Sequence, residues 1–151
     1  MSDSALLVLE QNLTNLVSSL RWLKRSYDHC QAIGLRNTYT EDEFDAFENL
    51  CSRYARTTDL IINKVLRSID AVEFIEAGSL IDATNRAEKR GIIDSVSELR
   101  DFKDLRNEIV HEYETEDLTE LFALVFKAVP NLITVAERIL HYCERYQAPN
   151  Q

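Results

Sequence analysis

The chain has 151 residues, of which 45% are hydrophobic and 28% are charged, a composition typical of one soluble globular domain rather than a disordered segment. Its formal net charge of −9 argues against a general, charge-driven affinity for nucleic acid, but not against a local basic cleft. The three glycines are widely separated, which excludes the clustered glycine loops that bind phosphates and dinucleotides.

The sequence predicts a reducing, cytoplasmic location. Cys30, Cys51 and Cys143 are odd in number and far apart in helical contexts, so we expect core thiols rather than a disulfide scaffold. The N-terminus has no basic region before its apolar residues, which argues against a secretory signal. No apolar run approaches the ~18 residues that a membrane span needs, so we expect no membrane association.

The first half of the chain shows helical spacing of its apolar residues. The first predicted helix covers residues 4–33 and ends at Gly34, a typical C-terminal stop. The second begins at Thr40-Glu-Asp-Glu43, a capping-box sequence, and runs through Val65.

Three more helices are predicted in the second half. A short one begins at Ser79-Leu-Ile-Asp82 and ends at Gly91. Another capping-box sequence, Ser95-Val-Ser-Glu98, starts a helix from residue 95 to about 114. Asp117-Leu-Thr-Glu120 starts the last helix, which continues to about Tyr146 with a kink at Pro130.

These elements predict an all-α fold for a single domain over residues 1–151. No stretch shows the sustained period-two alternation of a strand, and no linker or internal repeat divides the chain. The expected architecture is an antiparallel bundle of four main helices plus one short helix.

The helix from 95 to about 114 carries an arginine on its apolar face. With Leu99 set at 0°, Phe102 and Ile109 fall at about 300° and 280°, and Arg106 falls between them and Leu99, at about 340°. His111 falls at about 120°, on the polar flank. On an ideal helix, Arg106 and His111 are therefore ~140° apart around the axis and ~7.5 Å apart along it.

Geometry alone leaves two interpretations of these residues open. In one, Arg106 forms a salt bridge with a carboxylate, His111 compensates the helix dipole and Tyr113 packs in the core. In the other, Arg106 and His111 converge in a site, through a bent arginine side chain, a distorted helix end or two motifs that face each other across a dimer.

Residues 106–113, Arg-Asn-Glu-Ile-Val-His-Glu-Tyr, match the pattern Arg-x4-His-x-Tyr with a polar residue directly after the arginine. This pattern resembles the signature of the HEPN superfamily, and its tyrosine is similar to that of HepT-type toxins. The resemblance implies a metal-independent endoribonuclease with Arg106, Asn107 and His111 as catalytic residues. It also implies 2′,3′-cyclic phosphate products and no cofactor. Asn107 lies one helical turn before His111, so its side chain would contact the imidazole and orient it, or orient the substrate. His29, Cys30, His141 and Cys143 show no established metal-ligand spacing.

The resemblance also implies a partner. HepT-type toxins are neutralised by a cognate minimal nucleotidyltransferase, which transfers AMP to the motif tyrosine, here Tyr113. We further expect a two-fold homodimer with its two 106–113 segments near each other, because a symmetric pair doubles the groups around one cleft.

Two further expectations concern binding. Arg53 and Arg56 are candidate RNA-binding residues, although solvated helix faces are the more common role of such side chains. The rival function is a non-catalytic helical module that dimerises and presents a nucleotidyltransferase with its substrate. The full motif favours the nuclease, and the acidic balance favours the rival.

Overall fold

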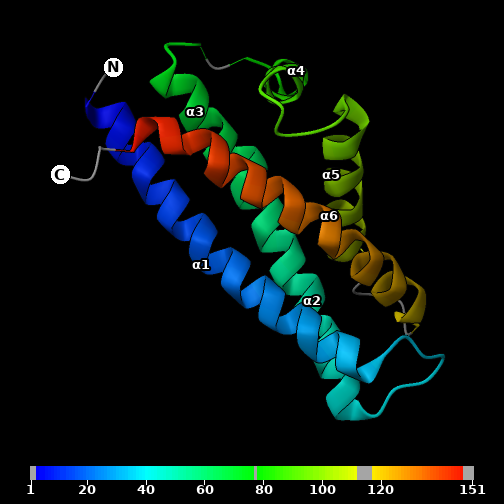
Figure 1. The fold of residues 1–151 in the computed structure, drawn as a ribbon. Coiled ribbons are helices and arrows are strands. Elements are labelled where there is room, and N and C mark those ends of the chain that lie inside the picture. The colour runs from blue at the N-terminus through cyan, green and yellow to red at the C-terminus, as the bar shows by residue number, and fades with distance from the viewer. Residues whose placement is uncertain (1–2, 77, 112–116, 148–151) are drawn as a thin grey trace.

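The computed structural model describes residues 3–76, 78–111 and 117–147, and every regular element in these ranges is helical (Figure 1). The predicted all-α class is therefore confirmed, with four main helical rods and one short helix. The predicted dimer stays a prediction.

The first helix, α1 (Asp3–Ile33), has the predicted bounds to within one residue. Its leucines at positions 9, 13, 16, 20 and 23 are buried along one face. Gly34 adopts φ +83°, and its N–H donates to the carbonyl oxygen of Cys30 at 2.9 Å. The left-handed glycine ends the helix as the sequence predicts.

The second rod is longer than predicted. It joins α2 (Glu41–Leu60), a π-helical segment η1 (Ile61–Val65) and α3 (Leu66–Val72) without a break. The capping box is confirmed: the N–H of Glu43 donates to Thr40 Oγ1 at 3.2 Å, and the N–H of Thr40 donates to Glu43 Oε1 at 2.9 Å. These bonds satisfy two N–H groups that a helix start leaves free.

The short helix, α4 (Leu80–Lys89), begins after Ser79 as predicted, and Ser79 and Asp82 form a capping box there. The next helix, α5 (Val96–His111), begins where predicted but with different bonds. Ser95 Oγ pairs with Ser97 Oγ, and Glu98 accepts from the N–H of Asp94 rather than that of Ser95. The predicted capping box at Ser95 is therefore wrong, because the Glu98 side chain reaches one residue further back.

The last helix, α6 (Thr119–Cys143), contains Pro130 and continues as a 3-10 turn, η3 (Glu144–Tyr146), which confirms the predicted end. The segment Thr119–Tyr146 is long and apolar enough to cross a membrane by length and composition, contrary to the sequence expectation. This is weak evidence, because core helices of soluble proteins pass the same test. Here α6 contacts α1, α2 and α5, and its apolar face is buried from Leu121 to Cys143.

The helices form an antiparallel bundle. Figure 1 shows α1 running alongside the α2–α3 rod, with α6 packed across both and α5 beside α6. The hydroxyl of Tyr54 donates to the carbonyl oxygen of Phe102 at 3.2 Å, which ties α5 to α2 inside the core. The helix that carries the motif is thus held against α2 on one side and α6 on the other.

A charged network fixes α4 and the end of α6 on α3. Asp70, whose side chain is 5% exposed, accepts two hydrogen bonds from Arg86 and lies 2.8 Å from Arg90 Nη2. Arg90 also bonds to Glu73 at 2.9 Å, and the hydroxyl of Tyr142 donates to Glu73 at 2.6 Å. Each buried charge has an opposite partner, as a buried charge requires.

Candidate functional site

Arg106 lies on the side of α5 that faces α2, where it pairs with Asp59. Its Nη2 donates to Asp59 Oδ2 at 2.9 Å, and its Nε lies 2.8 Å from Oδ1, although the Nε–H is not directed at that oxygen. The side chains are 32% and 39% exposed, so water reaches both. The structure thus gives the arginine on the apolar face a carboxylate partner, as the first of the two geometric interpretations requires.

Asn107 contacts Arg106. Its Oδ1 accepts a hydrogen bond from Arg106 Nη1 at 3.3 Å. The guanidinium is therefore held on two sides, by the Asp59 carboxylate and by the neighbouring amide. This contact differs from the expected one between Asn107 and His111, and it assigns Asn107 to the arginine within one chain.

His111 is the last described residue of α5 and is exposed to solvent. No contact among the described residues joins it to Arg106 or Asn107. One chain thus brings together Arg106, Asn107 and Asp59 and leaves the imidazole at the helix end. The predicted modification residue, Tyr113, lies outside the described residues.

The predicted apolar face of α5 is confirmed for most positions. Leu99, Phe102 and Ile109 are buried, with exposed fractions of 7% or less. Val110, which the same projection puts at about 20°, at the edge of the stripe, is 45% exposed. Arg106, in the same stripe, is about a third exposed and pairs with Asp59 of α2.

Asp59 is the site residue that the sequence did not reveal. It is the only acidic residue in the second half of α2, since the others lie between Glu41 and Glu48. If the packing of α5 on α2 were known, this position would identify Asp59 as the partner of Arg106. The packing of α5 on α2 is a feature of the tertiary structure, and it cannot be predicted from the local sequence.

The two candidate RNA-binding arginines lie on α2, before Asp59. Arg53 is partly buried, and its Cζ lies 5.0 Å from the ring centroid of Trp22 on α1. Arg56 is exposed, one helical turn before the Asp59–Arg106 pair. Both side chains therefore lie on α2, the helix whose Asp59 pairs with Arg106.

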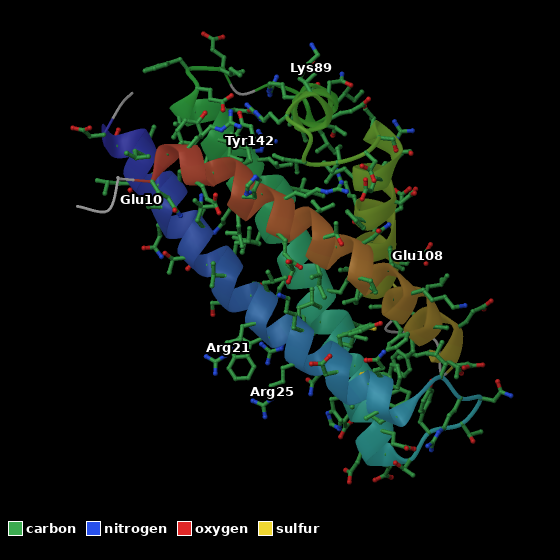
Figure 2. The ribbon with its side chains drawn as sticks, in the orientation of Figure 1. Glu10, Arg21, Arg25, Lys89, Glu108 and Tyr142 are labelled. Carbon is green, nitrogen blue, oxygen red and sulfur yellow. The ribbon has the colours of Figure 1, made fainter. Side chains whose placement is uncertain are left out.

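A groove of about 390 Å³ lies between α5 and α6 on the other side of α5. Its polar lining is mostly acidic, and Lys127 is the one cation among its described lining residues; the carboxylates are Glu98, Asp101, Asp104 and Glu108. Figure 2 shows Glu108 beside α5, and Arg21 and Arg25 on the opposite side of the bundle. The acidic groove and the surface that carries Arg21 and Arg25 thus lie on different sides of the bundle.

The three cysteines are free and buried, which confirms their predicted role as core residues. Burial raises the pKa of the Cys30 and Cys143 thiols to about 11 and that of Cys51 to about 12. No group of three or more metal-ligating side chains gathers in the part of the chain that the structure describes.

A family model described as "Ribonuclease HepT-like" matches residues 27–139. The match extends from the end of α1 to the last turns of α6 and includes Asp59 and the whole 106–113 motif. It covers well over half of the chain. No curated protein matches the chain.

Proposed function

The chain belongs to the HepT-like ribonuclease family, and from that premise we propose that it is the toxin of a toxin–antitoxin pair. The family assigns RNA as the substrate class. The proposed reaction is endonucleolytic and independent of metal: an RNA 2′-oxygen attacks the adjacent phosphorus, the P–O5′ bond breaks, and the products are a 2′,3′-cyclic phosphate and a 5′-hydroxyl.

Arg106 is the proposed phosphate ligand. Asp59 and Asn107 hold its guanidinium from two sides, and part of the side chain remains exposed. A guanidinium presents five N–H donors in a fixed plane, so Arg106 retains donors for a phosphate oxygen while it is bound to Asp59. This anchoring would stabilise the charge that develops on phosphorus in the transition state.

His111 is the proposed general base, which takes the proton from the 2′-hydroxyl. A neutral imidazole accepts a proton readily near pH 7, and the exposed position of His111 at the helix end leaves room for RNA. Asn107 is the proposed third catalytic residue: through Arg106 it would position the phosphate, which replaces its expected role in orienting the imidazole.

The observation that carries this proposal is the family match across the complete motif. The test uses purified protein, a chelator and an RNA whose product ends are analysed for cyclic phosphate. We expect Arg106→Ala and His111→Ala each to abolish most cleavage, whereas Arg100→Ala on the same helix and His141→Ala on α6 keep it. Cleavage unchanged in the first two variants, or dependent on added metal, contradicts the assignment.

Tyr113 is the proposed regulatory residue, and a cognate minimal nucleotidyltransferase is the proposed partner. The phenol oxygen would attack the α-phosphorus of ATP and release pyrophosphate, leaving AMP on the side chain. An added phosphate two residues from His111 would repel the RNA backbone and occupy its space.

Four of the five other tyrosines support this choice; the fifth, Tyr27, stacks its ring on that of Phe126. The hydroxyl of Tyr54 donates inside the core, those of Tyr142 and Tyr146 donate to Glu73, and that of Tyr39 accepts from the N–H of Arg36. These bonds compete with a role as nucleophile. Incubation with the partner, ATP and magnesium should add AMP mass to the peptide that contains Tyr113 and silence cleavage. Tyr113→Phe should escape the modification, and Tyr142→Phe should not; mass on another tyrosine would reject the assignment.

A two-fold homodimer is the proposed active form, since one chain leaves Arg106 facing α2 and His111 at the exposed helix end. If each site takes Arg106 from one chain and His111 from the other, mixing the two inactive variants restores one complete site in every heterodimer. Random exchange places half of the chains in heterodimers with one site of two intact, so about a quarter of the activity should return. No recovery after exchange would show that each site lies within one chain, or that no dimer forms.

The acidic groove between α5 and α6 favours the rival function, a non-catalytic module that docks a nucleotidyltransferase. Cationic side chains of a partner would complement its carboxylates. The two functions are separable, because Asp101→Asn with Asp104→Asn should weaken docking of the partner. The same pair of substitutions leaves Arg106, Asn107 and His111 in place, so RNA cleavage by the isolated protein tests the nuclease alone.

A further inference from the structure

Three arginines gather around the only tryptophan of the chain, Trp22 on α1. The Cζ atoms of Arg53, Arg25 and Arg21 lie 5.0, 5.3 and 5.6 Å from its ring centroid. Arg21 and Arg25 come from adjacent turns of α1, and Figure 2 shows both pointing outward from the bundle. Arg53 reaches the same ring from α2.

These arginines differ from most other arginines that line the helix contacts. Arg36, Arg86, Arg90, Arg106 and Arg138 each pair with a carboxylate. Among the residues that the structure describes, no carboxylate forms an ion pair with Arg21, Arg25 or Arg53. In a chain with 26 acidic and 17 basic side chains, three unneutralised guanidiniums around one ring are a local reversal of the overall charge.

The chemistry of the cluster suits the backbone of single-stranded RNA. The negative face of an indole attracts guanidinium groups and partly offsets their mutual repulsion. A guanidinium that stacks on a ring keeps its N–H edge free for a phosphate oxygen. Cationic side chains grouped around an exposed aromatic edge are the usual means of binding single strands without sequence preference.

The position of the cluster connects it to the motif. Along α2, Arg53, Arg56 and Asp59 follow at intervals of three residues, which is a rise of about 4.5 Å and a turn of about 60° at each step. Asp59 contacts Arg106, and the exposed Arg56 lies midway. An extended RNA strand that crosses the outer face of α2 would contact Arg53, then Arg56, then Arg106. It would avoid the acidic α5–α6 groove.

We propose that Trp22, Arg21, Arg25 and Arg53 form a binding site for the sugar–phosphate backbone of single-stranded RNA, which holds the substrate on one flank of Arg106. The proposal rests on the ribonuclease function above but concerns binding, so it is tested with an RNA that cannot be cleaved. A 2′-O-methyl oligonucleotide lacks the attacking hydroxyl and serves as this probe.

The single tryptophan reports binding directly, because the probe should quench Trp22 fluorescence on titration. Fluorescence anisotropy of a labelled probe then compares two triple variants of equal charge change. The site triple is R21Q/R25Q/R53Q, and the control triple K89Q/K127Q/R145Q removes three exposed cations elsewhere. If all three site arginines contact phosphates, the slope of log affinity against log salt should fall by about 2, which is roughly 100-fold in affinity at 0.1 M salt.

An equal loss in both triples would show an effect of net charge only and would overturn the site. Intact probe binding in the site triple, with the dimer or the complex with the nucleotidyltransferase lost instead, would identify the surface as a protein contact and also overturn it. R21Q and R25Q alone, both at exposed positions, keep the test valid if the triple folds poorly. Probe binding that depends on the site arginines while no RNA is cleaved would reject the nuclease proposal and leave the binding site standing.

Discussion

Asp59 should influence catalysis in two opposite ways, and Asp59→Asn separates them. The carboxylate anchors Arg106 through contacts of 2.8 and 2.9 Å, so its loss should leave the guanidinium less well positioned. The carboxylate also places a negative charge behind the residue proposed to bind phosphate. We therefore expect Asp59→Asn to lower kcat and, at the same time, to tighten RNA binding.

The structure sets the size of the binding effect. A phosphate on the free edge of the guanidinium would lie about 8 Å from the Asp59 carboxylate, given charge-assisted contacts of about 2.8 Å on both edges. Repulsion between two unit charges at that distance is about 0.5 kcal/mol in water and about 2 kcal/mol at an effective dielectric of 20. Because both side chains are about a third exposed, the lower end applies, a gain of roughly two- to fivefold in affinity.

The loss of positioning should be larger. Displacement of a catalytic group by about 1 Å can cost about 100-fold in rate, so we expect kcat to fall by about 10- to 100-fold. Steady-state cleavage gives kcat and KM, and a 2′-O-methyl RNA gives the dissociation constant. The gain in affinity should disappear at high salt, since screening removes the charge effect and not the anchoring effect.

Asp45→Asn is the matched control. Asp45 is exposed on the same helix, 14 residues or about 21 Å before Asp59, beyond the Debye length of about 8 Å at physiological salt. It should change neither constant. An unchanged kcat in Asp59→Asn would refute the anchoring role, and weaker RNA binding would refute the placement of phosphate at Arg106.

Three further predictions concern stability. Asp70→Asn leaves Arg86 and Arg90 without their shared buried carboxylate and should lower the free energy of unfolding by about 3–5 kcal/mol in urea denaturation; Asp94→Asn, which removes a pair with side chains 79% and 38% exposed, should cost less than about 1 kcal/mol, and equal costs would contradict the network. Burial of Glu73 favours its neutral form, but bonds from Tyr142, Tyr146 and Arg90 outweigh this and lower the pKa of its carboxyl from its ordinary value of 4.5. The stabilisation that the ionised Glu73 carboxylate gives the fold is therefore complete above about pH 4.5 and is lost as the pH falls through the lower folded-state pKa. Between pH 3 and 7, the melting temperature of Glu73→Gln should therefore fall less on acidification than that of the wild type. The buried thiols should react with a thiol reagent only upon unfolding, so fast labelling of native protein would contradict their burial.

Helix ends were predictable where the local backbone conformation or a capping bond requires one type of residue. Gly34 and Gly91 adopt φ of +83° and +75°, a conformation that other residues rarely take. Their positions in the sequence therefore predict the ends of α1 and α4. The Thr40 capping box and the helix start at Ser79 likewise depend on residues three apart, which the sequence displays directly.

Features that depend on packing were not predictable in this way. Residues 61–65, Ile-Ile-Asn-Lys-Val, include three β-branched residues of lower helix propensity, but no residue among them specifies the π-helical segment between α2 and α3. At Ser95 the box residues are present but Glu98 bonds to Asp94, because side chains choose among several nearby N–H groups. The exposed Val110 shows the same limit, since a helical projection gives an angle and not the neighbour that covers it.

In the candidate site, too, the features set by local sequence were predictable and those set by packing were not. Periodicity placed Arg106 on the apolar face and the motif suggested its chemistry, but only the fold supplies Asp59 as its partner. That partner is what the structural interpretation of Arg106 requires, and it also occupies part of the guanidinium that a phosphate would bind. The salt bridge is partly exposed, and such pairs add only about 0–1 kcal/mol to stability. Removal of Asp59 should therefore change the position of the arginine more than the stability of the fold.

The distribution of charge then decides how RNA approaches. A chain with a net charge of −9 repels a polyanion at long range, so binding depends on a surface whose cations are not already neutralised. The groove on the α6 side of α5 is lined by four carboxylates, whereas the Trp22 cluster on the α2 side leaves three arginines without one. If the motif cleaves RNA, we expect the RNA strand to reach Arg106 across α2. The acidic side of α5 is then free for a cationic partner. RNA and the nucleotidyltransferase would in that case bind on different sides of α5.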